Sequence, residues 1–213
     1  MRLRPTHFDR HLKNIGQDVL WLRSYACACM SNETGSPDPK HALCKGKGRI
    51  WDAPVPTLVG VPSQTTAAKM IAAGLWEKGD MTITIPRSSP MWENAGRYDR
   101  VIALNSTDVF SIPLKRGAPT EKLNFKVAAI SRVFWLDPTT RLTIDGVFPS
   151  ISDNGEVTWP DENAPPVGYI YSMTGTKYSE YYLFDNFPSD RNEHQGAQLP
   201  KKAQLRKWDL FGR

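Results

Sequence analysis

Apolar and polar residues alternate through the middle of the chain with the two-residue period of half-buried β-strands. The alternation is strict over residues 81–85, and it continues more loosely in segments rich in β-branched and aromatic residues. These segments are residues 98–104, 109–112, 125–136 and 142–148. Turn-forming residues separate them, for example at 105–108. The pattern predicts a mainly β fold containing a small antiparallel β-barrel or sandwich.

A further hairpin is predicted after a polar stretch at residues 152–166. Its arms are residues 167–173 and 178–184, and the turn between them contains Gly175. Glycine suits the positive φ that tight hairpin turns commonly need. We therefore expect the chain to reverse direction at residues 174–177.

Residues 6–22 carry a different period, because their apolar side chains recur at spacings of three and four, as on one face of a helix. These side chains are Phe8, Leu12, Ile15, Val19 and Leu22. Gly16 interrupts the pattern at a cost of about 1 kcal/mol relative to alanine. An N-terminal helix is therefore predicted that either continues to residue 22 or ends at Gly16, with residues 19–25 extended. An Ala-rich stretch at residues 66–73 predicts a second, shorter helix.

The loop at residues 27–49 is poor in large apolar side chains, so it cannot form a hydrophobic core of its own. It contains all three cysteines, and His41 lies three positions before the last of them. Three thiolates and one imidazole form a complete tetrahedral ligand set for zinc, and metal binding contributes free energy of folding. The loop is thus predicted to be a metal knuckle whose ligands are Cys27, Cys29, His41 and Cys44.

Other states of these cysteines also fit the sequence. Three is an odd number, and a reducing cytosol keeps thiols free. A disulfide between Cys27 and Cys29 is a further alternative, although a strained one. Iron binds the same thiolates, so the sequence leaves the metal open between zinc and iron.

Charge divides the chain into basic ends and an acidic middle. Residues 1–50 contain nine Lys or Arg against four Asp or Glu, and residues 200–213 contain five against one. Residues 51–199 consequently carry a net charge of −4. Basic ends suit an acidic partner, either nucleic acid or an acidic protein face. Solvated tails that bind no partner have the same composition, so the charge pattern fits both interpretations.

Three segments are expected from these patterns. Residues 1–52 hold the N-terminal helix and the metal knuckle, residues 53–187 hold the β-barrel body with the C-terminal hairpin, and residues 188–213 form a basic arm. The arm has few apolar residues before Leu199, so it either docks on a partner or folds back.

The sequence carries no phosphate-binding loop, dinucleotide-binding glycine motif, zinc-protease motif or hydrolase nucleophile motif. We therefore expect no enzymatic activity. No apolar run approaches the roughly 18 residues that span a bilayer, and the N-terminus leads into no apolar signal core. These features predict a protein that is made in the cytosol and does not enter a membrane.

Several segments resemble neck proteins of tailed bacteriophages, which lie between the head and the tail. The resemblance rests on residues 16–21, on the Cys27-Ala28-Cys29 motif and on residues 35–50, and it resumes at 79–82, 99–101 and 199–208. His41 stands where the family pattern has a cysteine, a substitution that keeps a metal ligand.

The resemblance implies a structural virion protein that forms a homo-oligomeric ring in the neck. Such a ring joins the DNA-filled head to the tail, between a portal-side connector and tail-side neck proteins, and is assembled in the host cytoplasm. DNA then passes through the channel without sequence-specific contact, and the extended terminal arms order on neighbouring subunits.

A zinc-containing module that binds single-stranded nucleic acid is the alternative, because a knuckle beside a small barrel also suits that class. Such a module should carry basic and aromatic residues together on its sheet. Here the positive surplus lies at the two ends of the sequence, whereas the strand region is net acidic.

Overall fold

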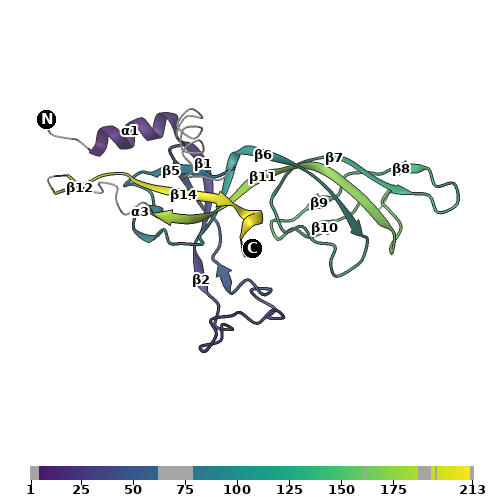
Figure 1. The fold of residues 1–213 in the computed structure, drawn as a ribbon. Coiled ribbons are helices and arrows are strands. Elements are labelled where there is room, and N and C mark those ends of the chain that lie inside the picture. The colour runs from purple at the N-terminus through teal and green to yellow at the C-terminus, as the bar shows by residue number, and fades with distance from the viewer. Residues whose placement is uncertain (1–4, 62–78, 161, 187–192, 195, 212–213) are drawn as a thin grey trace. The chain divides into compact units, whose positions relative to one another are not determined.

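The computed structural model describes residues 5–61, 79–160, 162–186, 193–194 and 196–211 (Figure 1). The fold is mainly β, with a large antiparallel sheet and an N-terminal helix, which confirms the predicted fold class. The chain forms two compact units: Met1–Asn105 and Glu180–Arg213 make up the first, and Ser106–Ser179 the second. The helix predicted at residues 66–73 lies outside the described residues.

The N-terminal helix of the first unit ends at Gly16. α1 (Pro5–Ile15) buries Leu12, and β1 (Gln17–Leu22) follows directly. The Gly16 N–H donates to the Leu12 carbonyl at 2.6 Å, and a Cβ at this position would lie only 2.3 Å from that oxygen. The structure therefore confirms the shorter of the two predicted helices.

The sheet of the first unit has the strand order β4-β1-β6-β11-β14-β5. Its other strands are β4 (Val55–Val59), β5 (Met81–Ile85), β6 (Arg100–Lys115), β11 (Ile170–Asn186) and β14 (Lys201–Lys207). Gly60, directly after β4, forms an antiparallel bridge with Thr84 of β5 through hydrogen bonds of 2.8 and 2.7 Å. The sheet therefore curls until its two edges touch at this bridge.

The curled sheet encloses the apolar core of the first unit. Fully buried side chains come from strands that are far apart in sequence, among them Val59, Ile83, Val101, Leu183 and Leu205. Burying one such side chain stabilises the fold by roughly 1.5–3 kcal/mol. The short helix α3 (Met91–Asn94) contributes the fully buried Met91 to the same core.

The C-terminal segment belongs to this core. β14 lies between β11 and β5 (Figure 1). Ala203 and Leu205 of this strand are fully buried. Folding back, one of the two predicted alternatives, is thus observed for residues 201–207. The predicted boundaries after residues 52 and 187 differ from the units of the structure, because composition does not reveal which strands pair. The remaining C-terminal elements are β12 (Glu193–His194), β13 (Ala197–Gln198) and the 3-10 helix η1 (Trp208–Leu210).

The second unit is built on the continuations of β6 and β11. β7 (Val127–Leu136) pairs with β11, and β8 (Thr143–Asp145) pairs with β7. β9 (Ser150–Ile151) and β10 (Val157–Thr158) form a separate hairpin. The unit has its own buried core, formed by Phe110, Leu123, Val133, Trp135, Tyr171 and Met173.

Two predicted turns are wrong, because both segments are continuous strand. Residues 105–108 lie within β6, and residues 174–177 lie within β11. A Cβ on Gly175 would lie 2.2 Å from the carbonyl oxygen of Ala129 on β7, and the pairing register shifts between Thr174 and Gly175. The glycine therefore permits close approach of two backbones at a β-bulge.

Polar side chains in β6 are also compatible with a continuous strand, because they form hydrogen bonds with side chains of β11. The Ser106 and Ser179 hydroxyl oxygens lie 3.1 Å apart, and the Ser179 hydroxyl donates to Asp108 at 2.9 Å. These side chains pair with each other across β6 and β11, so turn-like composition accompanies continuous strands. No described helix is both long and apolar enough to cross a membrane.

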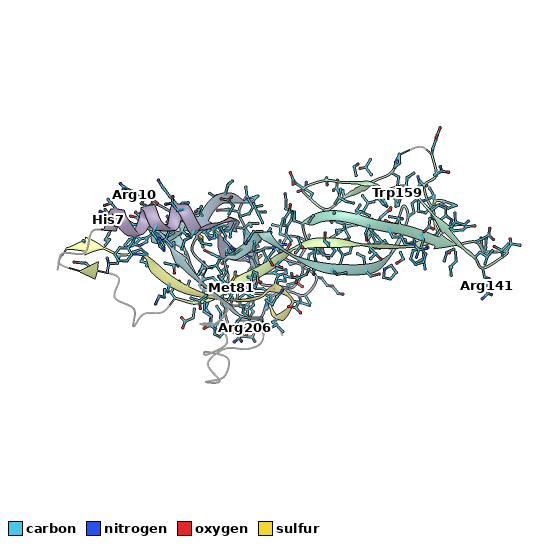
Figure 2. The ribbon with its side chains drawn as sticks, turned by 90° about the horizontal axis from the view of Figure 1, so that it is seen from above. His7, Arg10, Met81, Arg141, Trp159 and Arg206 are labelled. Carbon is cyan, nitrogen blue, oxygen red and sulfur yellow. The ribbon has the colours of Figure 1, made fainter. Side chains whose placement is uncertain are left out.

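The core of the second unit contains a buried tyrosine, and its ionisation at alkaline pH lowers the stability of the fold. The Tyr171 hydroxyl and the Trp159 indole N–H both donate to the Glu121 carboxylate at 2.8 Å (Trp159 is labelled in Figure 2). Burial, and then the hydrogen bond with Glu121, raise the pKa of Tyr171 above its usual value. A raised folded-state pKa gives stability that is complete below about pH 10 and is lost as the pH rises further.

We expect Tyr171→Phe to flatten this alkaline loss of stability, because the variant has no phenol to ionise. Urea unfolding at about pH 9 and about pH 11 measures the free energy of unfolding of both proteins. The variant also loses a hydrogen bond worth about 1 kcal/mol, but this loss is the same at both pH values and does not change the difference between them. Tyr178→Phe on the same strand is the control. An equally steep decline in Tyr171→Phe and in the unsubstituted protein would contradict the assignment.

Candidate metal centre

The four predicted ligands lie in the loop between β2 (Ser24–Ala26) and β3 (Arg49–Trp51), which pair antiparallel. The register continues one step beyond the strands, because the Cys27 N–H donates to the Gly48 carbonyl at 2.9 Å. This pairing fixes both ends of the loop. As a result, the Cys27-Ala28-Cys29 segment lies beside the segment that contains Cys44.

The structure brings all four ligand atoms together. The sulfur atoms of Cys27, Cys29 and Cys44 and a ring nitrogen of His41 all lie within 4.8 Å of one another. Cys27 Sγ is 3.4 Å from His41 Nδ1, and Cys29 Sγ is 3.4 Å from Cys44 Sγ. Sulfur ligands of one tetrahedral zinc ion lie about 3.8 Å apart, since each Zn–S bond is about 2.3 Å. The cluster therefore fits a single metal ion.

Local backbone geometry shapes the second half of the loop. The Lys45 N–H donates to the His41 carbonyl at 2.8 Å, and the Lys47 N–H donates to the Cys44 carbonyl at 2.9 Å. Gly46 has φ of +78°, and an added Cβ would lie 3.1 Å from Pro39 Cα. The chain can thus turn tightly after the last cysteine, as the sequence suggested, because glycine tolerates this conformation.

The thiols are unequal in acidity. Burial and hydrogen bonds with Cys44 and Cys27 raise the pKa of Cys29 to about 11. Burial also acts to raise the pKa of Cys44, but hydrogen bonds from Cys29, the Gly48 backbone N–H and His41 outweigh it and lower that pKa to about 6. The lowered pKa favours the thiolate form of Cys44, which is the form of cysteine that binds metals.

The structure contains no disulfide bond among the three cysteines. All three cysteines are free, and the 3.4 Å separation of the Cys29 and Cys44 sulfur atoms exceeds the roughly 2.0 Å of a disulfide bond. Cys27 and Cys44 are buried although the loop around them is exposed: Leu43, next to Cys44, is 76% exposed. The four side chains are thus the inward-facing part of a loop that has no apolar centre.

A second feature of the first unit is a cleft of about 590 Å³ that the knuckle loop helps to line. Met30, Pro37, Lys47, Gly48 and Arg49 come from that loop, and the other lining residues come from segments far away in sequence. None of the described lining residues is acidic, and most are basic or aromatic, including Lys47, Arg49, Arg97, Tyr98, Phe184 and Arg206. Sequence analysis missed this site, since its residues share no local spacing; the basic surplus at both ends was the available signal.

No protein-family model matches the chain, and no curated protein matches it at a significant level.

Proposed function

We propose that this chain is a structural protein of the tailed-bacteriophage neck, and that Cys27, Cys29, His41 and Cys44 hold one structural zinc ion. In this role the subunits form a homo-oligomeric ring between a portal-side connector and tail-side neck proteins. The ring joins the DNA-filled head to the tail and surrounds the DNA channel. It is assembled in the host cytoplasm and remains in the virion.

The observation that carries the proposal is the cluster of three cysteines and one histidine in a loop without an apolar core. Its four ligand atoms lie within 4.8 Å of one another, and its neighbour Leu43 is 76% exposed. A metal ion would therefore supply the free energy that keeps the loop folded. The N-terminal knuckle, together with residues 199–208, is also where the sequence resembles phage neck proteins well.

The ligand set favours a structural over a catalytic metal. Four protein ligands complete a tetrahedral shell, whereas catalytic zinc keeps one position open for water or substrate. Iron bound by the same thiolates is distinguished from zinc by elemental analysis of the purified protein. An iron content equal to the protein content would replace zinc in the proposal and leave the ligand set unchanged.

The charge pattern supports the placement of the protein around DNA. Residues 51–199 have a net charge of −4, which suits a channel wall along which DNA slides. The basic ends suit acidic surfaces of neighbouring proteins.

Inactivation of the gene in the phage or prophage that carries it tests the neck proposal. We expect negative-stain electron microscopy to show DNA-filled or leaking heads beside separate, finished tails. Expression of the unsubstituted protein from a plasmid should restore joined particles, which controls for effects on neighbouring genes. Intact, infectious particles without the protein would overturn the proposal.

A further inference from the structure

The charged side chains that line the cleft beside the knuckle are all positive. Four cationic side chains line it, namely Lys47, Arg49, Arg97 and Arg206, and no described lining residue is acidic. Arg206 (labelled in Figure 2) forms an ion pair with Asp80, with Arg206 Nε 3.4 Å from Asp80 Oδ1. The described ion pairs do not involve Lys47, Arg49 or Arg97, so these three account for the attraction of the cleft for anions.

The arginines and aromatic rings of the cleft alternate. The guanidinium carbon of Arg49 lies 4.5 Å from the centre of the Tyr98 ring, and that of Arg97 lies 4.9 Å from the same ring. Arg97 is also 5.7 Å from the Phe184 ring, and Arg206 is 4.1 Å from Phe184. The order is therefore Arg49, Tyr98, Arg97, Phe184, Arg206. Each distance is within the range of a cation–π contact.

Guanidinium groups that lie over aromatic rings still offer N–H donors to an anionic ligand. A guanidinium whose face rests on a ring keeps the N–H groups at its edge free to bind a phosphate bidentately. Flat guanidinium and aromatic surfaces also stack with nucleobases. The same side chains can thus contact both the backbone and the bases of a nucleic-acid strand.

Tyr98, the second member of this row, is held in place by its backbone hydrogen bonds and by ring packing. Its φ is +77°, a conformation that is uncommon for a bulky residue. Its N–H donates to the Leu183 carbonyl at 2.8 Å, and its carbonyl accepts from the Trp51 indole at 3.0 Å. Phe211 packs edge-on against its ring at a centroid distance of 5.7 Å. The stacking surface is therefore in place before any ligand arrives.

We infer that this cleft binds a short stretch of single-stranded nucleic acid, with phosphates on Lys47, Arg49 and Arg97 and bases against the flat guanidinium and aromatic surfaces of the row. The inference is independent of the proposed neck function. The sequence argues against nucleic-acid binding, because its surplus of basic residues lies at the two ends of the chain. The fold removes this objection, since it brings Arg49 and Arg206, one from each basic end, into one cleft. An acidic peptide would use the same charges but would gain nothing from the flat, stacked surfaces.

The test is fluorescence anisotropy of a labelled oligothymidylate about 10 nucleotides long, titrated with the metal-loaded full-length protein. We expect salt-dependent binding. Removing Arg49 and Arg97 together by alanine substitution should flatten the slope of log affinity against log salt by about 1.4, since each phosphate contact contributes about 0.7. Tyr98→Leu should weaken binding by about 5- to 100-fold, whereas Tyr98→Phe should bind like the unsubstituted protein.

Arg132→Ala is the matched control. Arg132 also stacks on a ring, 4.7 Å from the centre of Phe134, but it belongs to the second unit and is not part of the cleft. Its loss should leave the affinity unchanged. Circular dichroism of each variant checks the fold, and Arg97→Ala keeps the test valid if Tyr98→Leu unfolds, because Arg97 is exposed.

Three results would overturn the inference. The first is no binding at low ionic strength. The second is equal affinity for a polyglutamate peptide of the same length, with equal losses in the variants, which would identify the cleft as a site for acidic protein segments. The third is binding that Arg132→Ala weakens as much as the cleft variants do. None of these results bears on the particle morphology that tests the neck proposal, so the two can fail separately.

Discussion

Replacing Cys44 by serine is expected to release the metal ion and unfold the loop at residues 27–49, while the sheet of the first unit remains folded. Serine at this position supplies no thiolate, so three ligands remain for a site that needs four. Loss of an outer-shell partner alone weakens metal binding by about 10- to 100-fold, and loss of a direct ligand should exceed that range. The loop has no apolar core to compensate, as the exposure of Leu43 shows.

Two measurements check this expectation on the same sample. Metal content by elemental analysis should fall from about one ion per chain to near zero after dialysis. Hydrogen exchange should show fast exchange at the Cys27, Lys45 and Lys47 amides, which the folded loop protects through backbone hydrogen bonds. Exchange in β5 and β14 should stay slow.

His41→Cys is the informative companion variant, because cysteine also serves a tetrahedral site and should retain the metal. Asn32→Ala, an exposed change in the same loop, controls for nonspecific loosening. A Cys44→Ser protein with its full metal content would eliminate the ligand set. Unfolding of His41→Cys would show that His41 has another role.

Replacing Asp99 by alanine should destabilise the first unit by about 3–5 kcal/mol, the range for a buried hydrogen-bond network that loses its acceptor. The Asp99 carboxylate is 1% exposed. Its oxygens accept from the Trp21 indole at 2.7 Å, the Ser24 N–H at 2.8 Å and the Gly96 N–H at 2.9 Å. Alanine would leave these three donors without their acceptor; the Trp21 indole is buried, and the two backbone N–H groups are half-buried.

Urea unfolding of the full-length chain measures the effect. Asp52→Ala is the control, because this exposed carboxylate also accepts a hydrogen bond, from the Tyr25 hydroxyl at 2.8 Å. Its replacement should lower the free energy of unfolding by less than about 1 kcal/mol. Asp99→Asn should lie between the two, since one amide oxygen still accepts. A loss below about 1 kcal/mol in Asp99→Ala would mean that water replaces the carboxylate and that the network is not essential.

The sequence was informative where one local rule decides the outcome. The predicted strand at residues 81–85 coincides with β5, because its side chains alternate between two faces of a sheet. The helix end at Gly16 follows from the low helix propensity of glycine. The four side chains that cluster in the knuckle loop were also identified, since a loop that lacks apolar residues and contains all the cysteines is a candidate for stabilisation by a metal ion.

Predictions failed where distant strands decide the conformation of a segment. Residues 105–108 and 174–177 have turn-like compositions, but β6 and β11 hold them extended through pairing with each other and, for β11, with β7. Gly175 illustrates the ambiguity, because glycine is equally suited to a turn and to close approach of two strands. Sequence alone does not reveal which of these applies.

The cleft could not be predicted for the same reason. Arg49, Tyr98, Phe184 and Arg206 lie on segments that meet only through the β2–β3 pairing and the neighbouring positions of β6, β11 and β14. No spacing rule connects such residues. A composition argument placed the basic residues at the ends and the aromatic residues in the middle, and therefore treated them as separate.

The position of β14 between β11 and β5 has a consequence for the order in which the protein folds on the ribosome. The second unit is continuous in sequence, so its strands can pair as soon as they emerge, whereas the first unit lacks two of its strands until residues 180–207 are made. At about 5–20 residues per second, β5 and the first half of β6 wait roughly 5–20 s for these partners. During this interval their apolar side chains, including Ile83 and Val101, are exposed, and chaperone binding at this stage would favour recovery of folded protein.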